Sequence, residues 1–321
     1  MARYYHHHTG SAANIPVPDP TPVLTFSPVT LPSKDGKRPV DLMMRVSVPA
    51  SGTNLPIILL SHGLGHANYI SSHYGYTPMS DFYAGRGFVV IQPTHLDSHF
   101  LGLENKDGLP WQSRLSDMKQ ILDELDVIEA AVPTLKGRLD KSNIGIVGHS
   151  MGGFTASLFL GAKNVHTVTG EVFHGRDERI KAGVTLAAAG NGGDDLTEAA
   201  RSMLPFYAPD FSTMTAPTLV AYGDEDALRI TNRQSVDWYA DAYTHSPSPK
   251  ALFAVKGGKH GLGGVSTWDA GETDDESPER LASTQRVTWA YLRYQLCGDR
   301  EAWDKAVEAL KGLDLGSIQT K

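Results

Sequence analysis

The sequence is nearly without cysteine and carries no excess of positive charge. Cys297 is the only cysteine among the 321 residues, so no disulfide can form within the chain and the fold does not depend on an oxidising compartment. We interpret Cys297 as a buried or half-buried apolar residue rather than as a nucleophile. The formal net charge is −7 at pH 7. We therefore expect no nucleic-acid partner, because proteins that bind nucleic acids present basic patches.

Long hydrophobic runs are missing as well. No window holds 18 consecutive apolar residues, so we expect no transmembrane segment. The N-terminal residues have no apolar stretch typical of a signal peptide, and we expect a cytoplasmic protein, with secretion open if a signal peptide has been removed. His6, His7 and His8 resemble a tag remnant or a disordered arm more than a metal site.

Motifs for nucleotides and metals are absent too. The chain has neither G-x-G-x-x-G nor G-x-x-x-x-G-K-[ST] after a predicted strand, and it has no H-E-x-x-H. Several of its 13 histidines fall in the loops that follow the second and third predicted strands, where they would line a pocket: His62, His66, His73, His95 and His99. Their spacing is not that of metal ligands, and we expect no metal and no other cofactor.

Short apolar segments alternate with helical patterns along most of the chain. We predict strands at 40–48, 55–61, 88–93, 143–148, 182–188, 217–223 and 251–256, and helices at 77–85, 112–130, 151–162, 232–243, 277–298 and 299–311. Strands that alternate with helices predict an α/β fold with a largely parallel central sheet and helices on both faces. We expect a flexible arm at 1–22, a domain at 23–298, and a helical extension of that domain at 299–321.

The segment G-H-S-M-G follows one of these strands directly. It contains Gly148, Ser150 and Gly152, and a helical pattern begins after it. A tight strand–turn–helix admits only small residues beside the turn and leaves the serine hydroxyl exposed at the edge of the sheet. The amides of the next helix would point to where negative charge develops. We therefore predict Ser150 as a nucleophile.

A serine nucleophile needs a base, and the base needs an acidic partner. His260, in the loop after the last predicted strand, is the best candidate for the base. His149 lies inside the turn and is expected to pack beside it. Asp224 and Asp226 both follow the strand at 217–223; we favour Asp226 as the acid and keep Asp224 as the alternative, which would otherwise be a turn residue.

Acyl transfer also needs donors for an oxyanion. The backbone N–H of Met151 is the first candidate, and that of Leu64, in the segment H-G-L-G after the strand at 55–61, is the second. A simple glycine turn is the alternative for that segment.

Four motifs together, S-H-G-L-G, G-H-S-M-G-G-F, Y-G-D-E-D and G-K-H-G, resemble the α/β-hydrolase family over about residues 35 to 296. They are most similar to its platelet-activating-factor acetylhydrolase and dienelactone-hydrolase-like branch. The resemblance implies an α/β-hydrolase fold and the same roles for Ser150, Asp226, His260, Leu64 and Met151. Dienelactone hydrolases proper use a cysteine nucleophile, whereas this chain has Ser150. The segment G-H-S-M-G, the nucleophile elbow, is also similar to that of cutinases and polyester hydrolases.

These observations predict a serine hydrolase that cleaves carboxylic esters, with a small-molecule or lipid-like ester as its substrate. An acyltransferase or a thioesterase could use the same residues, so both alternatives stay open. Oligomeric state is left without a prediction.

The surroundings of the site are predicted more loosely. Phe100, Leu101, Leu103 and Trp268 are candidates for pocket walls, and 189–212 for a segment that folds over the entrance. An acidic segment is interpreted as a solvated loop, with a cation or partner site as the alternative: Glu272, Asp274, Asp275 and Glu276.

Overall fold

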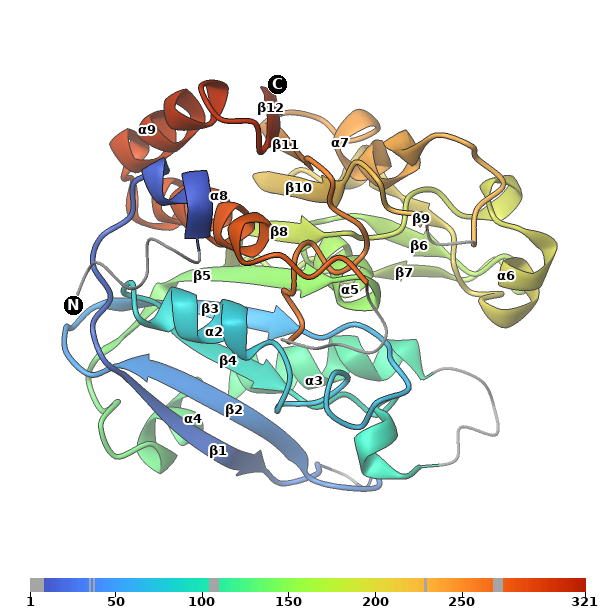
Figure 1. Ribbon diagram of the computed structural model, residues 1–321. Coiled ribbons are helices and arrows are strands. Elements are labelled where there is room, and N and C mark those ends of the chain that lie inside the picture. Colours follow the sequence, from blue (N-terminus) through green and yellow to red (C-terminus); the bar gives the residue numbers. More distant parts are fainter. Residues whose placement is uncertain (1–8, 35, 37, 104–109, 228–229, 268–273) are drawn as a thin grey trace.

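A mixed sheet of nine strands lies at the centre of the computed structural model, which describes residues 9–34, 36, 38–103, 110–227, 230–267 and 274–321 (Figure 1). In spatial order the strands are β1 (Val23–Leu31), β2 (Leu42–Pro49), β4 (Val89–Pro93), β3 (Leu55–Ser61), β5 (Leu139–His149), β8 (Ile180–Leu186), β10 (Thr218–Gly223), β11 (Lys250–Val255) and β12 (Gly316–Thr320). Pairing is parallel from β4 to β11 and antiparallel at both edges. The predicted α/β fold is confirmed.

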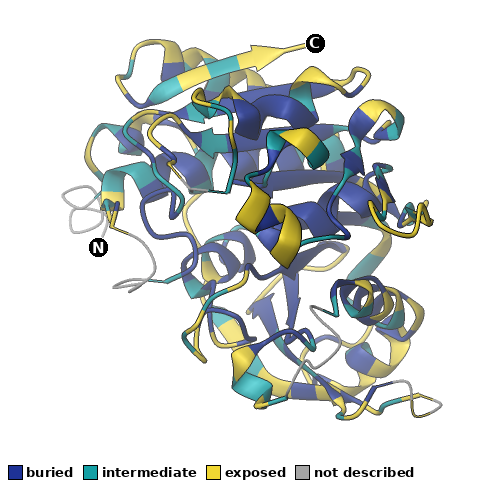
Figure 2. Ribbon diagram, turned by 90° about the vertical axis from the view of Figure 1, so that its right-hand side faces the viewer, coloured by how far each residue is buried: buried dark blue, intermediate teal, exposed yellow. Residues whose placement is uncertain are grey.

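Each inner strand sends alternate side chains to two hydrophobic clusters, one on each face. In β3, Ile57 and Leu59 belong to the first cluster, and Ile58 and Leu60 to the second. This is the period of two that every strand imposes, and both faces are apolar because both are covered. Figure 2 accordingly shows the inner strands as buried, whereas the last strand, β12, remains largely at the surface.

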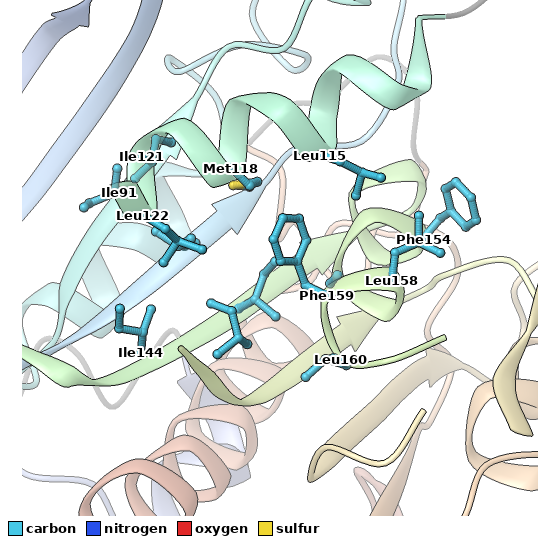
Figure 3. Packing of buried hydrophobic residues seen from close by; sticks show 14 of the residues in the cluster. Ile91, Leu115, Met118, Ile121, Leu122, Ile144, Phe154, Leu158, Phe159 and Leu160 are labelled. Carbon is cyan, nitrogen blue, oxygen red and sulfur yellow. The ribbon is translucent and has the colours of Figure 1, made fainter. Parts of the chain in front are cut away.

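Three helices cover the first face: α3 (Trp111–Asp123), α4 (Leu125–Ala131) and α5 (Met151–Phe159). Figure 3 shows how Leu115, Met118 and Ile121 of α3 point toward Phe159 of α5 and toward the strands. The second face carries α2 (Thr77–Ala84), α8 (Pro278–Cys297) and α9 (Arg300–Lys311). The two layers fix the sheet between them, and the carboxyl ends of the parallel strands form one edge.

Some helices end where the sequence predicts and others do not. In α8 the Ser277 hydroxyl accepts a hydrogen bond from the Arg280 amide, and the helix stops at Gly298 with φ 71°, so both predicted signals are confirmed. The predicted helix at 112–130 breaks at Glu124 into α3 and α4. In place of the helix predicted at 232–243 the chain forms a 3₁₀ turn (Val236–Ala240) and the short α7 (Asp241–Thr244).

The edge strands were not predicted. β1 contains Pro28 and is largely exposed, and β12 is short and polar, so neither has the apolar pattern of a buried strand. Residues 299–321 therefore form a helix followed by a strand rather than a purely helical extension.

Part of the predicted flexible arm packs onto the domain. Residues Gly10–Asn14 form a 3₁₀ helix, η1, and Ala12 and Ile15 are fully buried in the second cluster. The Ser11 hydroxyl donates to Glu279 of α8 at 2.7 Å. The expectation for residues 9–15 was wrong because one isoleucine and one alanine among prolines and small residues give no periodic signal, yet they fill a gap beside α8.

The segment 189–212 packs against the helix that follows Ser150. It contains the 3₁₀ turn η3 (Gly193–Asp195), the helix α6 (Glu198–Met203) and the strand β9 (Pro209–Asp210), and the 3₁₀ turn η4 (Phe211–Thr213) follows. β9 joins β6 (Lys163–Val165) and β7 (Val172–His174) in a small antiparallel sheet. Phe206 stacks on Trp111 with ring centroids 5.1 Å apart, and Tyr207 contacts Phe154.

Two smaller observations concern α8 and membranes. Cys297, the last residue of α8, is exposed, so the expectation of a buried or half-buried cysteine was wrong. In the described part of the chain, no helix has the length and apolar character needed to cross a membrane.

The packing of the arm gives a first prediction. Ile15→Ala should lower the free energy of unfolding by about 2–5 kcal/mol, because it removes a fully buried side chain and leaves a cavity. Val168→Ala, at a side chain that is 76% exposed, should change it by less than about 0.5 kcal/mol. Urea unfolding of both variants measures the difference. Equal stabilities would mean that residues 9–15 are not packed in solution.

Candidate active site

The turn between β5 and α5 holds Ser150 in an unusual backbone conformation. Its φ is 54° and its ψ is −120°, a region that costs a side-chain-bearing residue about 1–3 kcal/mol. A Cβ on Gly148 would overlap the carbonyl of Gly152, and one on Gly152 would overlap the carbonyl of Ser61 at the end of β3. The two glycines are therefore required by the close approach of three backbone segments, as the motif predicts.

The Ser150 side chain lies in a line of hydrogen bonds with two other predicted residues. The Ser150 Oγ lies 2.9 Å from His260 Nε2, and His260 Nδ1 lies 2.9 Å from Asp226 Oδ2. Because a carboxylate only accepts, Nδ1 carries the proton and the Nε2 lone pair faces the hydroxyl. Side-chain exposure is 22% for His260 and 1% for Asp226. Such a line can move a proton from the hydroxyl to the imidazole.

The two aspartates of the loop after β10 have different roles in the structure. Asp226 is buried, and its Oδ1 accepts a hydrogen bond from the Tyr239 hydroxyl at 3.0 Å. Asp224 is exposed and accepts the Gly257 amide at 2.7 Å, which holds the turn before His260. The geometry thus pairs His260 with Asp226, and Asp224 is a turn residue.

The H-G-L-G loop after β3 lies against the nucleophile turn. A Cβ on Gly63 would be 3.2 Å from the Ser150 Cβ. The Gly63 carbonyl accepts from His62 Nδ1 at 2.7 Å and from Arg114 Nη2 at 3.5 Å. In a trans peptide the C=O and N–H point in opposite directions, so holding this carbonyl also aims the Leu64 N–H. Within the described residues, neither the Leu64 nor the Met151 amide donates to a protein acceptor.

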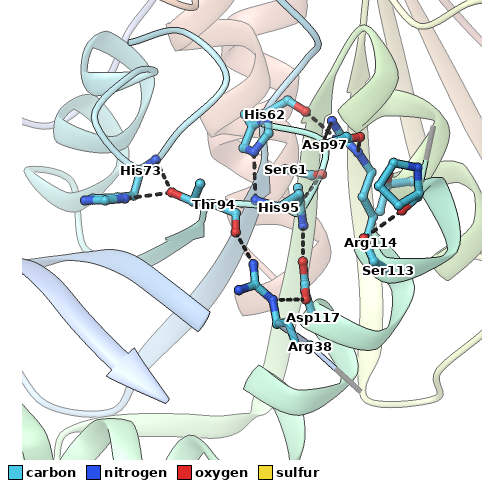
Figure 4. A network of polar contacts seen from close by, with 12 residues as sticks. Arg38, Ser61, His62, His73, Thr94, His95, Asp97, Ser113, Arg114 and Asp117 are labelled. Atoms are coloured by element: carbon cyan, nitrogen blue, oxygen red, sulfur yellow. Dashed lines mark hydrogen bonds and ion pairs between the residues drawn. The ribbon is translucent and has the colours of Figure 1, made fainter. Parts of the chain in front are cut away.

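A buried polar network supports this loop from below (Figure 4). Arg114 pairs with Asp97 through Nε–Oδ2 at 2.5 Å and Nη2–Oδ1 at 3.0 Å, and its Nη1 donates to the His62 carbonyl at 2.6 Å. Both side chains are fully buried. This ion pair was not predicted from the sequence, because Asp97 and Arg114 are 17 positions apart and neither lies in a motif.

The network continues through a second serine–histidine–aspartate arrangement. His95 contacts Ser61 Oγ through Nε2 at 3.0 Å and Asp117 through Nδ1 at 2.9 Å, and Arg38 also binds Asp117. Ser61 and His95 have no exposed surface, so this arrangement cannot reach a substrate and instead fixes the end of β3. His62 Nε2 accepts the His95 backbone amide at 3.0 Å, which joins it to the loop.

Burial keeps the histidines of this region neutral. It lowers the pKa of His62 and that of His95 well below the ordinary value. It lowers the pKa of His73 to about 4 and that of His149 to about 3. Burial acts oppositely on a carboxylic acid and raises the pKa of Asp117 to about 6. His62, His73 and His95 are thus hydrogen-bonded structural residues rather than pocket lining.

Other predicted pocket residues lie as follows. Phe100 meets His73 and Tyr74 edge-on, with ring centroids 5.5 and 5.3 Å away, and Leu101 and Leu103 are half-buried nearby in the chain. His66 and His99 are exposed, with their ring centroids 5.6 Å apart. Among the described residues, no group of three or more histidine, cysteine, aspartate or glutamate side chains could hold a metal ion. Trp268 lies outside the described residues.

The acidic segment is only partly a solvated loop. Asp275 is buried, and its Oδ2 accepts the Lys259 amide at 2.7 Å and the Gly263 amide at 3.2 Å, so it braces the loop that carries His260. Asp274 is exposed and pairs with Lys259, Glu276 is exposed, and Glu272 lies outside the described residues. The interpretation as a solvated loop was wrong for Asp275. Its neighbours in the sequence are acidic too, so the sequence does not show that it is Asp275 that accepts two backbone amides.

Comparison with known proteins gives a family and two partial relatives. The model of the "Alpha/beta hydrolase family" matches residues 57–312. Dipeptidyl peptidase family member 6 of Caenorhabditis elegans is 32% identical over 151 residues, 46% of this chain and 18% of the relative. Acylamino-acid-releasing enzyme 2 of Oryza sativa subsp. japonica is 31% identical over 156 residues, 48% of this chain and 18% of the relative. The matches cover less than a fifth of either relative.

The neutral histidines predict that acid destabilises the fold. Folded His73 and His149 stay unprotonated down to about pH 4 and about pH 3, whereas the unfolded chain takes up these protons below 6.5. Stability is therefore lost as pH falls from 6.5, by at most about 1.4 kcal/mol per pH unit for each histidine. Asp117 offsets part of this between pH 3.8 and about 6, because its raised pKa favours the folded state in acid.

Urea unfolding at pH 7 and at pH 5 measures the loss. His73→Gln should flatten the dependence, because it removes one of the groups that the folded state keeps neutral. Equal free energies of unfolding at the two pH values, or an unchanged slope in the variant, would contradict this account.

Proposed function

The chain belongs to the alpha/beta hydrolase family, and on that premise we propose that it is a serine hydrolase that cleaves carboxylic esters through an acyl-enzyme intermediate. One observation carries the proposal: Ser150, His260 and Asp226 form a hydrogen-bonded line at a strained turn between a strand and a helix. A residue held at positive φ in such a turn is expensive to keep, which favours a functional role.

In the proposed mechanism, His260 Nε2 takes the proton from the Ser150 hydroxyl as the oxygen attacks the acyl carbon. Asp226 keeps the imidazole oriented and stabilises the imidazolium that forms. The Leu64 and Met151 amides hold the oxyanion. His260 then gives its proton to the leaving alcohol, and a water molecule repeats the sequence on the acyl-enzyme to release the acid.

The proposed substrate is a small-molecule or lipid-like ester. Within the family, we propose that the chain belongs to the platelet-activating-factor acetylhydrolase and dienelactone-hydrolase-like branch. Three large hydrophobic side chains of the loop beside the nucleophile are exposed and suit an apolar acyl or alcohol group: Leu64, Tyr69 and Tyr74. The same residues would serve a thioesterase, an acyltransferase or a polyester hydrolase, and the acceptor and leaving group distinguish these reactions.

Peptide bond hydrolysis is the second candidate. It is favoured by the names of the two relatives, a dipeptidyl peptidase family member and an acylamino-acid-releasing enzyme. The Ser150–His260–Asp226 line would serve amides and esters alike. Release of p-nitroaniline from acylated amino-acid p-nitroanilides, faster than p-nitrophenol from matched esters after correction for intrinsic reactivity, would favour this candidate.

The proposal predicts that Ser150→Ala abolishes ester hydrolysis. A series of p-nitrophenyl esters from acetate to palmitate should be hydrolysed by the wild type, and kcat should fall by about 10⁴-fold or more in the variant, because its nucleophile is gone. Ser157→Ala, at a buried serine of the same helix whose hydroxyl bonds the Gly153 carbonyl, is the matched control and should retain activity. Activity in Ser150→Ala would exclude Ser150 as the nucleophile.

The two aspartates give a second prediction. Asp226→Asn should lower kcat by about 10³- to 10⁴-fold, because an amide beside His260 Nδ1 no longer selects the tautomer that accepts the serine proton. Asp224→Asn should stay within about 3-fold of the wild type, because the asparagine side-chain oxygen can still accept the Gly257 amide. Steady-state kinetics on the best ester decides, and the reverse order would assign the acid to Asp224.

A further inference from the structure

Tyr76 connects the three loops that carry the proposed catalytic groups. It precedes α2, and its side chain is 1% exposed. Its hydroxyl lies 2.9 Å from the Gly63 amide nitrogen and 2.8 Å from His149 Nδ1. His149 Nε2 in turn lies 2.7 Å from the carbonyl oxygen of His260. One chain of hydrogen bonds thus runs from the H-G-L-G loop, named the oxyanion loop for its proposed role, through the nucleophile turn to the base.

The direction of each bond is fixed by the groups at the two ends. The Gly63 N–H can only donate, so the Tyr76 oxygen accepts there. The His260 carbonyl can only accept, so His149 carries its proton on Nε2 and presents the Nδ1 lone pair. Tyr76 then donates its own proton to that lone pair. No bond in the chain can reverse, and each member has one arrangement that satisfies it.

The backbone holds Tyr76 firmly in this place. Its φ is 59°, which a residue with a side chain adopts only when its surroundings demand it. Its amide donates to the Ser266 carbonyl at 2.5 Å, and the preceding Gly75 lies so close to the backbone of Tyr69 and Ile70 that a Cβ there would be 2.7 Å from the Ile70 oxygen. The hydroxyl is therefore presented from a rigid support.

We propose that Tyr76 is a positioning residue, whose hydroxyl fixes the oxyanion loop relative to Ser150 and His260. The inference rests on the proposed function, since it concerns the same site. Gly63 is held on both sides: Tyr76 binds its N–H, while His62 and Arg114 bind its carbonyl. The peptide that bears the Leu64 N–H follows this residue directly. Loss of the hydroxyl frees one side, and the amide that should meet the oxyanion becomes loosely aimed.

Tyr76→Phe tests the proposal, because it removes the hydroxyl and keeps the ring. The oxyanion forms only in the transition state, so kcat should fall by about 10- to 100-fold while KM for the p-nitrophenyl ester changes by less than about 3-fold. Tyr83→Phe is the matched control. Tyr83 belongs to α2, is fully buried, and bonds Thr288 at 2.8 Å, away from the site. It should lose stability but keep kcat.

A second variant tests whether the chain acts as one unit. His149→Phe cuts the same chain at the next link, and it should lower kcat to a similar degree. The kcat of the double variant Tyr76→Phe/His149→Phe should be no more than about 3-fold below that of the less active single variant, because a hydrogen-bond chain that is already broken has little further effect to lose. If the two losses in kcat multiply instead, Tyr76 and His149 do not act as one linked chain, and the proposal is overturned. Should Tyr76→Phe fail to fold, His149→Phe decides alone: an unchanged kcat would overturn the proposal.

Covalent labelling by a fluorophosphonate separates this inference from the proposed function. The wild type should be labelled at Ser150, and Tyr76→Phe should be labelled about 10-fold or more slowly, with Tyr83→Phe at the wild-type rate. A wild type that is neither labelled nor active on any ester would overturn the proposed function and this inference with it. A wild type that is labelled, together with Tyr76→Phe labelled equally fast, would overturn the inference alone.

Discussion

Everything in the site depends on how closely β3, β5 and α5 approach one another around Ser150. Gly148 and Gly152 have no side chains, and this lets the carbonyls of Gly152 and Ser61 occupy space that a Cβ would need. The chain must therefore turn sharply, and Ser150 takes the positive φ that the turn imposes. The same closeness brings the loop after β3 against the serine, so one packing constraint places both the partly exposed Ser150 and the amides around it.

Such a turn stores strain, and the surrounding structure must hold it. Here the support is largely polar and buried: Arg114, paired with Asp97, binds the His62 and Gly63 carbonyls of the H-G-L-G loop, and His95 with Asp117 fixes the end of β3. Buried polar groups are stabilising only when they are satisfied, and His62, His95 and His149 each use one ring nitrogen as a donor and the other as an acceptor. Hydrogen bonds in such a network fix the orientation of the backbone groups that they join, which apolar packing cannot do.

The elements that could be predicted are those whose own residues show a local sequence pattern, such as an apolar run or the start and stop residues of a helix. Strands β3 and β4 are buried on both faces and read as apolar runs, and α8 has both its start and its stop signal. β12 and the 3₁₀ helix η1 could not be predicted, because short or polar segments gain their structure from partners far along the chain. In the site, the elbow and the loop histidine stand out in sequence, but nothing local distinguishes Asp275 from its acidic neighbours or marks Tyr76.

The residues that escape prediction share a physical property. Asp275, Arg114 and Tyr76 each bind backbone amides or carbonyls of a distant loop, and Arg114 and Tyr76 do so in addition to a side-chain partner. A backbone group offers the same donor and acceptor at every position, so such contacts leave no complementary residue type in the sequence. Motifs therefore identify the groups proposed to react, whereas the contacts that aim them appear only in three dimensions. In this fold, the accuracy of the site rests on side chains that recognise the backbone.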